Sequence, residues 1–191
     1  MKKLFALLLV CACLLSLGTA ALAEGEEMVP VCVSVPETWE APCLWAWADD
    51  GTNAFAAWPG EEADKLGDTG WYYCYVPSFV QNVIVNANAG AVQTEGVVVE
   101  AGKPVWITVA EDNTATVSYD AQTDAEIPEY VEKITVHAYV PLEWKTVNLW
   151  AWLDPDGTNA FETWPGKAMT ENENGWFTAR VPAWVNLSLI H

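Results

Sequence analysis

Short runs of alternating apolar and polar residues, separated by turn-forming residues, dominate the pattern along this chain. Leu44 to Ala48 alternates strictly, and no segment has the 3.6-residue period of an amphipathic helix. The predicted strands of the first half are 29–35, 44–48, 71–76, 83–86, 97–99, 105–109 and 114–119. About seven short strands in about 90 residues predict an all-β fold of the β-sandwich class.

The same pattern then occurs a second time. The stretch 44–60 reads LWAWADDGTNAFAAWPG, and the stretch 149–166 reads LWAWLDPDGTNAFETWPG, with one extra residue in its Asp-Pro-Asp-Gly turn. At matched spacing, Trp39, Trp45, Trp47 and Trp71 recur as Trp144, Trp150, Trp152 and Trp176. An internal repeat of this length indicates two copies of one small domain.

The repeat sets the expected domain boundaries. We expect module 1 at 28–119, an acidic linker at 120–131 and module 2 at 132–191. Module 2 ends at the counterpart of the predicted strand 83–86, so three later strands of module 1 have no counterpart. Because a sandwich without its last strands exposes apolar faces and strand edges, we expect module 2 to be truncated and the chain to be a fragment of a longer protein.

Residues 1–23 have the features of a secretory signal peptide. Lys2 and Lys3 precede an apolar run at 4–17, and small residues precede the predicted cleavage after Ala23. The apolar run is short for a membrane span, so we expect a secreted, extracellular product without membrane insertion. A lipoprotein signal at Cys13 is the alternative, but that cysteine lies early in the apolar run.

The net charge and the cysteine content limit the ligands, disulfides and metal sites that can be expected. The formal net charge is −18, which disfavours nucleic acid and anionic lipid as ligands. Cys32, Cys43 and Cys74 all lie in module 1, so one pair could bridge and leave one thiol over. Their counterparts in module 2 are not cysteines, so a disulfide is not part of the shared fold. Cysteine and histidine spacings typical of metal sites are absent, and we expect no metal and no cofactor.

Strand periodicity assigns the aromatic side chains to faces. Trp45 and Trp47 share one face of their strand, and Leu44, Ala46 and Ala48 form a complete core-facing set on the other. We therefore expect both tryptophans to point outward as an interaction surface; the alternative is that both faces are buried. The proline and glycine after Trp58 favour a stiff turn that holds this indole at a loop tip, the alternative being a plug at the end of the sandwich.

Four further tryptophans are less informative. Trp71 and Trp176 each follow a glycine at the start of a strand, and we assign both to the core. Trp39 and Trp144 lie in the first loop of each copy, where the pattern gives no assignment.

The order of these features resembles a known family. Trp-x-Trp, an Asp/Gly/Asn turn, Trp-Pro-Gly, Gly-Trp-Tyr or Gly-Trp-Phe, and Val-Ile-Val-Asn followed by Gln-Thr resemble the family 26 carbohydrate-binding modules, which bind starch. The resemblance covers 29–119 and the second copy as far as it extends. It implies an immunoglobulin-like β-sandwich and non-catalytic binding of α-glucans such as amylose, amylopectin and malto-oligosaccharides.

The resemblance also implies which residues contact the sugar. The strand aromatics fall on Trp45 and Trp47, the platform tryptophan on Trp58 and the polar contact on Gln93. In the second copy the aromatics fall on Trp150, Trp152 and Trp164, and the chain ends before a counterpart of the glutamine. The family often has tyrosines at the strand positions; tryptophan keeps the apolar face but removes a hydroxyl group, so we expect fewer hydrogen bonds to sugar.

We therefore expect a monomeric starch-binding tandem, part of a secreted amylolytic or starch-adhesion protein. The alternative is a cell-surface adhesion repeat with an immunoglobulin-like sandwich and a protein partner. We expect no catalytic site. Glycosidases need two carboxylates at a set separation, whereas Asp49 and Asp50 are adjacent in a turn that explains both.

Overall fold

The structure is a computed structural model that describes residues 26–141, 143–144, 146–155, 157–161, 163–172 and 175–185. The described residues form two compact units, and the boundary falls between Ile127 and Pro128. The predicted signal peptide and the last six residues of module 2 lie outside the described residues. Among the described residues, no helix is both long and apolar enough to cross a membrane.

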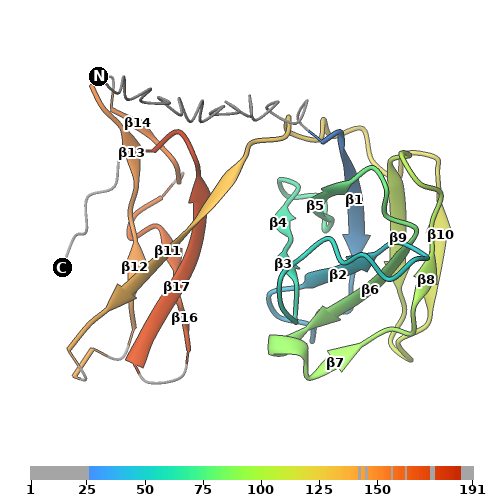
Figure 1. Ribbon diagram of the computed structural model, residues 1–191, viewed down its shortest axis with the longest axis horizontal. Helices are drawn as coiled ribbons and strands as arrows, with labels where there is room; N and C mark the ends of the chain where they lie inside the picture. The colour runs from blue at the N-terminus through green and yellow to red at the C-terminus, as the bar shows by residue number, and fades with distance from the viewer. Residues whose placement is uncertain are drawn as a thin grey trace, which may run out of the picture. The chain divides into compact units, whose positions relative to one another are not determined.

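Module 1 is built from two five-stranded sheets (Figure 1). The first sheet has the order β10-β9-β1-β5-β4, with β1 antiparallel to β5 and parallel to β9. Its strands are β1 (Met28–Ser34), β4 (Asp64–Lys65), β5 (Tyr72–Pro77), β9 (Val105–Val109) and β10 (Ala115–Ser118). The predicted all-β sandwich is therefore confirmed for this unit.

The second sheet has the order β3-β2-β6-β7, and β8 also pairs with β6. Its strands are β2 (Cys43–Trp47), β3 (Glu61–Glu62), β6 (Asn82–Ala87), β7 (Val92–Gln93) and β8 (Val97–Val98), with a short 3-10 turn η1 (Asn88–Gly90) between β6 and β7. Leu44 and Ala46 of β2 pair with Val85 and Val83 of β6, and all four are fully buried. Strict alternation thus fills the core with aliphatic side chains.

A separate apolar cluster covers the outer face of the first sheet. It consists of buried Cys32, Leu66 and Trp106, with Trp71 packed edge-on against Trp106 at 4.9 Å between ring centroids and 81° between planes. Ile127, from the segment predicted as linker, packs against the same cluster. Trp71 therefore lies outside the main core to which we assigned it, and residues up to Ile127 pack on module 1.

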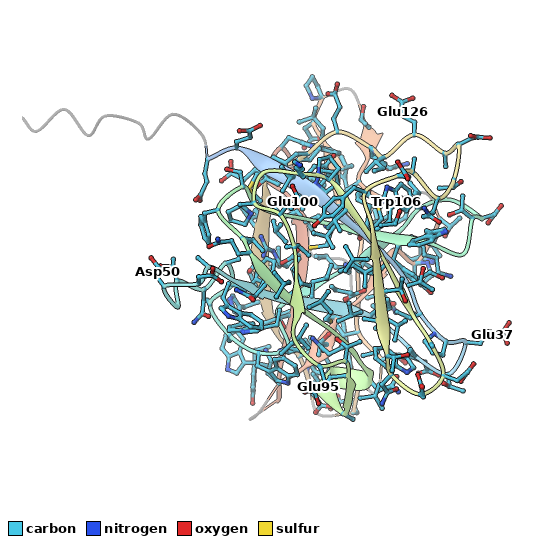
Figure 2. All side chains as sticks on the ribbon, turned by 90° about the vertical axis from the view of Figure 1, so that its right-hand side faces the viewer. Glu37, Asp50, Glu95, Glu100, Trp106 and Glu126 are labelled. Atoms are coloured by element: carbon cyan, nitrogen blue, oxygen red, sulfur yellow. The ribbon has the colours of Figure 1, made fainter. Side chains whose placement is uncertain are left out.

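Acidic side chains surround module 1. Those labelled in Figure 2 are all exposed and project from separate loops and turns: Glu37, Asp50, Glu95, Glu100 and Glu126. The spread of these carboxylates gives the unit a negative surface without one concentrated patch. Such a surface repels anionic ligands.

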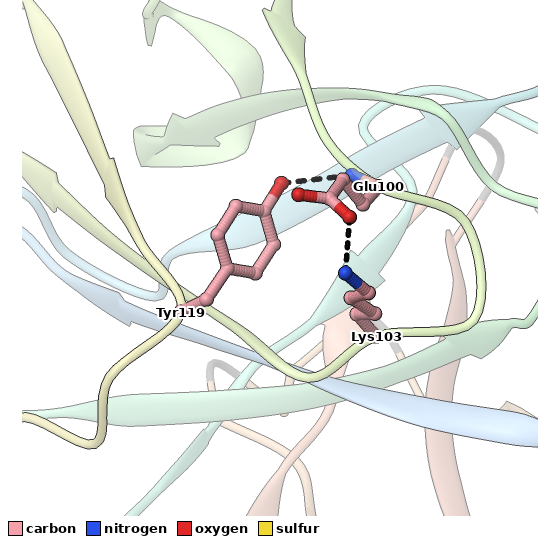
Figure 3. A network of polar contacts seen from close by, with 3 residues as sticks. All are labelled: Glu100, Lys103 and Tyr119. Atoms are coloured by element: carbon pink, nitrogen blue, oxygen red, sulfur yellow. Dashed lines mark hydrogen bonds and ion pairs between the residues drawn. The ribbon is translucent and has the colours of Figure 1, made fainter.

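A small polar network fixes the chain after β10 (Figure 3). The backbone N–H of Glu100 donates to the Tyr119 hydroxyl at 2.8 Å, and Lys103 forms an ion pair with the Glu100 carboxylate. The Lys103 ammonium also lies 5.9 Å from the centre of the Tyr119 ring. The hydrogen bond to Glu100 is the main cause that raises the pKa of Lys103. These contacts hold the end of module 1 against the connection between β8 and β9.

Module 2 has the same kinds of element in shorter pieces. Its strands are β11 (Lys133–Tyr139), β12 (Asn148–Leu149), β13 (Trp152–Leu153), β14 (Thr158–Asn159), β15 (Lys167–Ala168), β16 (Thr170–Glu171) and β17 (Trp176–Pro182). They form a three-stranded sheet, β11-β17-β16, and the two pairs β12-β15 and β13-β14. Leu149, Ala151 and Val181 are the most deeply buried residues of its core.

The core assignment of Trp176 is wrong. Trp176 is 46% exposed and lies 5.5 Å from the ring of Tyr139, which is 63% exposed. Phe177 and Ala179 point into the core from the same strand, so alternation turns Trp176 to the opposite face. By contrast, Trp39 belongs to the core of module 1 and Trp144 packs against the core of module 2.

The described cysteines form no disulfide. Cys32 points to the outer face of β1 and Cys74 to the core face of β5, while Cys43 lies in the other sheet. The two neighbouring strands therefore direct their thiols to opposite sides, and the bridge that the cysteine count left open is not made. Burial raises the pKa of the Cys32 thiol to about 12.

Candidate functional site

The outer face of β2 carries two tryptophans. Trp45 and Trp47 are half-buried, whereas Leu44 and Ala46, which alternate with them along the strand, are completely buried. Trp45 lies opposite Ile84 of β6 and Trp47 opposite Asn82. The facing predicted from alternation is confirmed, and the alternative in which both tryptophans pack between the sheets is wrong.

The turn after β2 uses its carboxylates for structure. Thr52 donates its backbone N–H to the Asp50 carboxylate at 2.9 Å, and this hydrogen bond is the main cause that lowers the pKa of Asp50. The Asp49 carboxylate accepts a hydrogen bond from the Asn82 amide at 2.8 Å, and the Asp49 N–H donates to the Gln81 side chain at 3.1 Å. These bonds close the turn and tie it to β6, which agrees with the turn-forming role predicted for both residues.

Trp58 lies beside Trp45 on this face. Its side chain is 42% exposed, and the two rings are 6.2 Å apart with 59° between their planes. Two tilted rings form a V-shaped apolar surface rather than a flat one. Such a surface complements a curved ligand with apolar patches on its inner side.

The Trp-Pro-Gly turn is packed directly on the β2 backbone. Gly60 has φ +94°, and a Cβ atom there would overlap the carbonyl oxygen of Leu44. The side-chain amide of Asn86 donates to the Pro59 carbonyl at 2.9 Å from beneath the turn. Glycine is needed at this position for both its conformation and its size, and it lets Trp58 stand close to the sheet.

The η1 turn supports the other side of the Trp58 ring. Gly90 has φ +83°, and a Cβ atom there would overlap the indole nitrogen of Trp58. The Asn88 N–H donates to the Glu40 carbonyl at 3.0 Å, and the Glu40 N–H donates to the Asn88 side chain at 2.8 Å. These two bonds anchor η1 to the loop before β2, so the ring is held between Trp45 and a fixed backbone.

Gln93 lies on the same face as the tryptophans. It pairs with Asn86 across β6 and β7, and Asn86 pairs with Cys43 on β2, so all three share one side of the sheet. Gln93 is exposed, and a Cβ atom at Gly96, three residues further on, would lie 3.6 Å from the edge of the Trp47 ring. The structure thus brings the four predicted residues of module 1 to one face; that they bind a ligand stays a prediction.

Module 2 repeats the central part of this arrangement. The rings of Trp150 and Trp164 are 5.7 Å apart with 55° between their planes, and Trp164 is 65% exposed. Gly166 has φ +89°, and a Cβ atom there would overlap the Leu149 carbonyl oxygen, as at Gly60. Trp152 donates its indole N–H to the Asp154 carboxylate at 3.0 Å, so this ring is fixed by the neighbouring turn.

Two supports of the site were missed by the sequence analysis. Asn86 follows Val83, Ile84 and Val85 in β6, and a polar residue directly after this apolar run was a signal that could have been used; the structure buries it completely. Gly90 gave no local signal, because its role depends on a ring that lies far away in the sequence.

Comparisons with known proteins agree with this description. The family model of starch-binding module 26 matches residues 31–98 and 136–191, one segment in each copy. An α-amylase of Butyrivibrio fibrisolvens is 30% identical over 179 residues, which cover 84% of this chain. The chain spans only 18% of the length of that amylase.

Two solved structures are also similar. One is a crystal structure of a family 26 module from Eubacterium rectale in complex with maltoheptaose; it is 17% identical with a TM-score of 0.38, covering 83% of this chain and 77% of that one. The other is a solution structure of a family 25 module of a β/α-amylase from Paenibacillus polymyxa, 13% identical with a TM-score of 0.38, covering 51% of this chain and 97% of that one. With both of its copies matched by the family model, this chain belongs to the starch-binding module 26 family.

Proposed function

We propose that this chain binds starch and related α-1,4-glucans without cleaving them, and that the tilted tryptophan pairs are the contact surface. The observation that carries the proposal is the repetition of one geometry. Trp45 with Trp58 and Trp150 with Trp164 have closely similar ring separations and inter-plane angles of 59° and 55°. Both copies keep this pair, together with the glycine that positions it.

The physical chemistry of glucose fits such a pair. Each pyranose ring has apolar C–H faces, and an α-1,4 chain curves, so two rings at an angle can contact successive sugars. Burial of about 100 Å² of apolar surface per stacked sugar contributes about 2–3 kcal/mol. After the cost of ordering a flexible chain, a net binding free energy of about 5–7 kcal/mol corresponds to a Kd of about 10–100 µM.

The same site gives no support to hydrolysis. Asp49 and Asp50 are occupied in holding the turn after β2. Hydrolysis by inversion or retention needs two carboxyl groups facing the bond to be broken. We infer that the modules are non-catalytic and belong to a secreted amylolytic or starch-adhesion protein, exported by residues 1–23. Secretion of the full chain with loss of that segment would test this part.

Isothermal titration with maltoheptaose tests the binding site. We expect Trp58→Ala to remove the module 1 site and Trp164→Ala the module 2 site, while the double variant shows no heat and no retention on granular starch. Trp71→Ala is the matched control, because it removes a tryptophan in ring contact on the opposite sheet. It should lower the melting temperature and leave the affinity unchanged.

The opposite outcome is equally clear. Full affinity for maltoheptaose in the folded double variant would show that the tilted pairs are not the site. If the wild-type chain bound no α-glucan at all, the exposed tryptophans would serve a protein partner instead, as in a cell-surface adhesion repeat.

A further inference from the structure

A depression continues the proposed glucan face of module 1 around the edge of its second sheet. It has a volume of about 520 Å³ and lies between the segment 93–97 and the turn 112–115 that joins β9 to β10. Gln93 and Gly96 line it, and a Cβ atom at Gly96 would lie 3.6 Å from the Trp47 ring, so this ring borders the depression. The hollow therefore begins where the aromatic face ends.

The side chains in this depression have hydrogen-bonding capacity to spare. Within the described residues, the side chains of Gln93, Glu95 and Asn113 form no hydrogen bond, and all three are exposed. Figure 2 shows Glu95 at the surface of module 1. Together they offer a carboxylate and two amides, the groups that protein sites use to bind sugar hydroxyls.

The turn that forms the far wall is held in shape by its own bonds. The Asp112 carboxylate accepts hydrogen bonds from the Thr114 hydroxyl at 2.6 Å and from the Thr114 N–H at 3.1 Å. The hydroxyl bond is the main cause that lowers the pKa of Asp112. Asn113 follows with φ +65° at the tip of the turn, so its side chain is presented by a defined backbone. A preformed wall spares a ligand the entropy cost of ordering it.

We propose that this depression is a further glucan subsite, which receives the sugar units that extend beyond Trp47. The inference rests on the proposed function, since it assumes that the aromatic face holds an α-glucan. Sugar hydroxyls donate to the Glu95 carboxylate and exchange hydrogen bonds with the amides of Gln93 and Asn113. The carboxylate also restricts the ligand to neutral glucans, because a phosphorylated chain would be repelled.

A subsite beyond the aromatic face makes affinity depend on chain length. A trisaccharide contacts only the tryptophans, whereas a heptasaccharide is long enough to reach the depression as well. Removal of the subsite should therefore weaken binding of the long ligand and spare the short one. Loss of an aromatic contact would weaken binding of both ligands.

The test compares maltotriose with maltoheptaose by isothermal titration of the full chain. The chain carries Trp164→Ala, so that the titration measures binding at module 1 alone. We expect Glu95→Ala with Asn113→Gly to reduce the maltoheptaose affinity about fivefold to tenfold, with the maltotriose affinity changed by less than about twofold. Glycine at 113 keeps the positive φ. Glu111→Ala is the control: it removes an equal charge from the turn that carries Asn113, but Glu111 does not line the depression.

Three results would overturn the subsite. They are no loss in the double variant, an equal loss for both sugars, and a rise in melting temperature with Ca²⁺ that Glu95→Ala abolishes, which would show a cation site instead. Maltoheptaose binding by the wild-type chain with an unaffected double variant defeats this inference alone. Absence of any binding by the wild-type chain defeats the proposed function and this inference together.

Discussion

Asn86 is the buried residue that connects the core of module 1 to its aromatic face. It is completely buried in β6, yet its side-chain N–H donates to the Pro59 carbonyl in the turn that carries Trp58. Its side-chain oxygen has no hydrogen-bond partner in the structure. A buried acceptor without a partner costs about 1–3 kcal/mol, so this residue serves the placement of Trp58 better than it serves stability.

Asn86→Ala is therefore expected to affect binding more than folding. The variant loses the bond to Pro59 but also removes the unpartnered oxygen, and these effects oppose each other, so the unfolding free energy should change by less than about 2 kcal/mol. The maltoheptaose affinity of module 1 should fall about fivefold to twentyfold as Trp58 loses its support. Titration and thermal unfolding measure the two quantities separately.

Thr94→Val is the matched control for this prediction. Thr94, the residue after β7, is also polar and almost completely buried, and its hydroxyl accepts a hydrogen bond from the Val85 N–H at 3.2 Å. The control should lose stability and keep its affinity. The exciton signal of the Trp45–Trp58 pair in circular dichroism should weaken in Asn86→Ala alone. Equal changes of affinity in both variants would contradict a positioning role for Asn86.

At the scale of the element, η1 acts as a support for a residue that it does not contain. A side chain at Gly90 would displace the Trp58 indole, whereas Gly102, also at positive φ, has only the Ser78 carbonyl oxygen nearby at 3.9 Å. Gly90→Ala and Gly102→Ala should each lose about 1 kcal/mol of stability from the backbone conformation. Only Gly90→Ala should lower the maltoheptaose affinity, by about tenfold or more. Titrations in which the two variants bind alike would show that η1 is not a support.

The longer strands were predictable because their alternation is local. The predicted strands 29–35 and 44–48 correspond to β1 and β2 within one or two residues, since each has a complete apolar face. The two-residue strands β3, β4 and β7 escaped prediction, because their pairing depends on neighbours supplied by the folded sheet. Trp176 was misassigned because its glycine was considered instead of its parity with Phe177.

In the candidate site, too, the features set by local alternation were predictable and those set by tertiary contacts were not. Periodicity gave the facing of Trp45 and Trp47, since both are set by one strand. It could not give the angle between Trp45 and Trp58, which is fixed by Gly90 and Asn86, well over twenty positions away in the chain. A site assembled from several elements depends on tertiary contacts, which the residue pattern of a single segment does not predict.

At the scale of the whole molecule, the chain carries two aromatic pairs, and the proposed α-glucan ligand is a polymer with many positions at which a pair could bind. For maltoheptaose, the two modules are independent sites, so Trp58→Ala should halve the stoichiometry and leave the Kd of the remaining site unchanged. On amylose, the second contact becomes intramolecular and its effective concentration is in the millimolar range for a short linker. The intact chain should therefore dissociate from an amylose-coated surface about 10- to 100-fold more slowly than Trp58→Ala or Trp164→Ala.

The two single variants serve as controls for each other, because each keeps one intact pair with nearly the same ring geometry. Surface plasmon resonance on amylose, with free maltoheptaose as competitor, measures the dissociation rates. If the wild-type chain left amylose as fast as either variant while still binding about two maltoheptaose molecules in solution, the modules could not reach one polymer chain together. Slow release of the wild type that excess maltoheptaose accelerates to the rate of the single variants would establish that bivalence, and not a stronger site, retains the protein on starch.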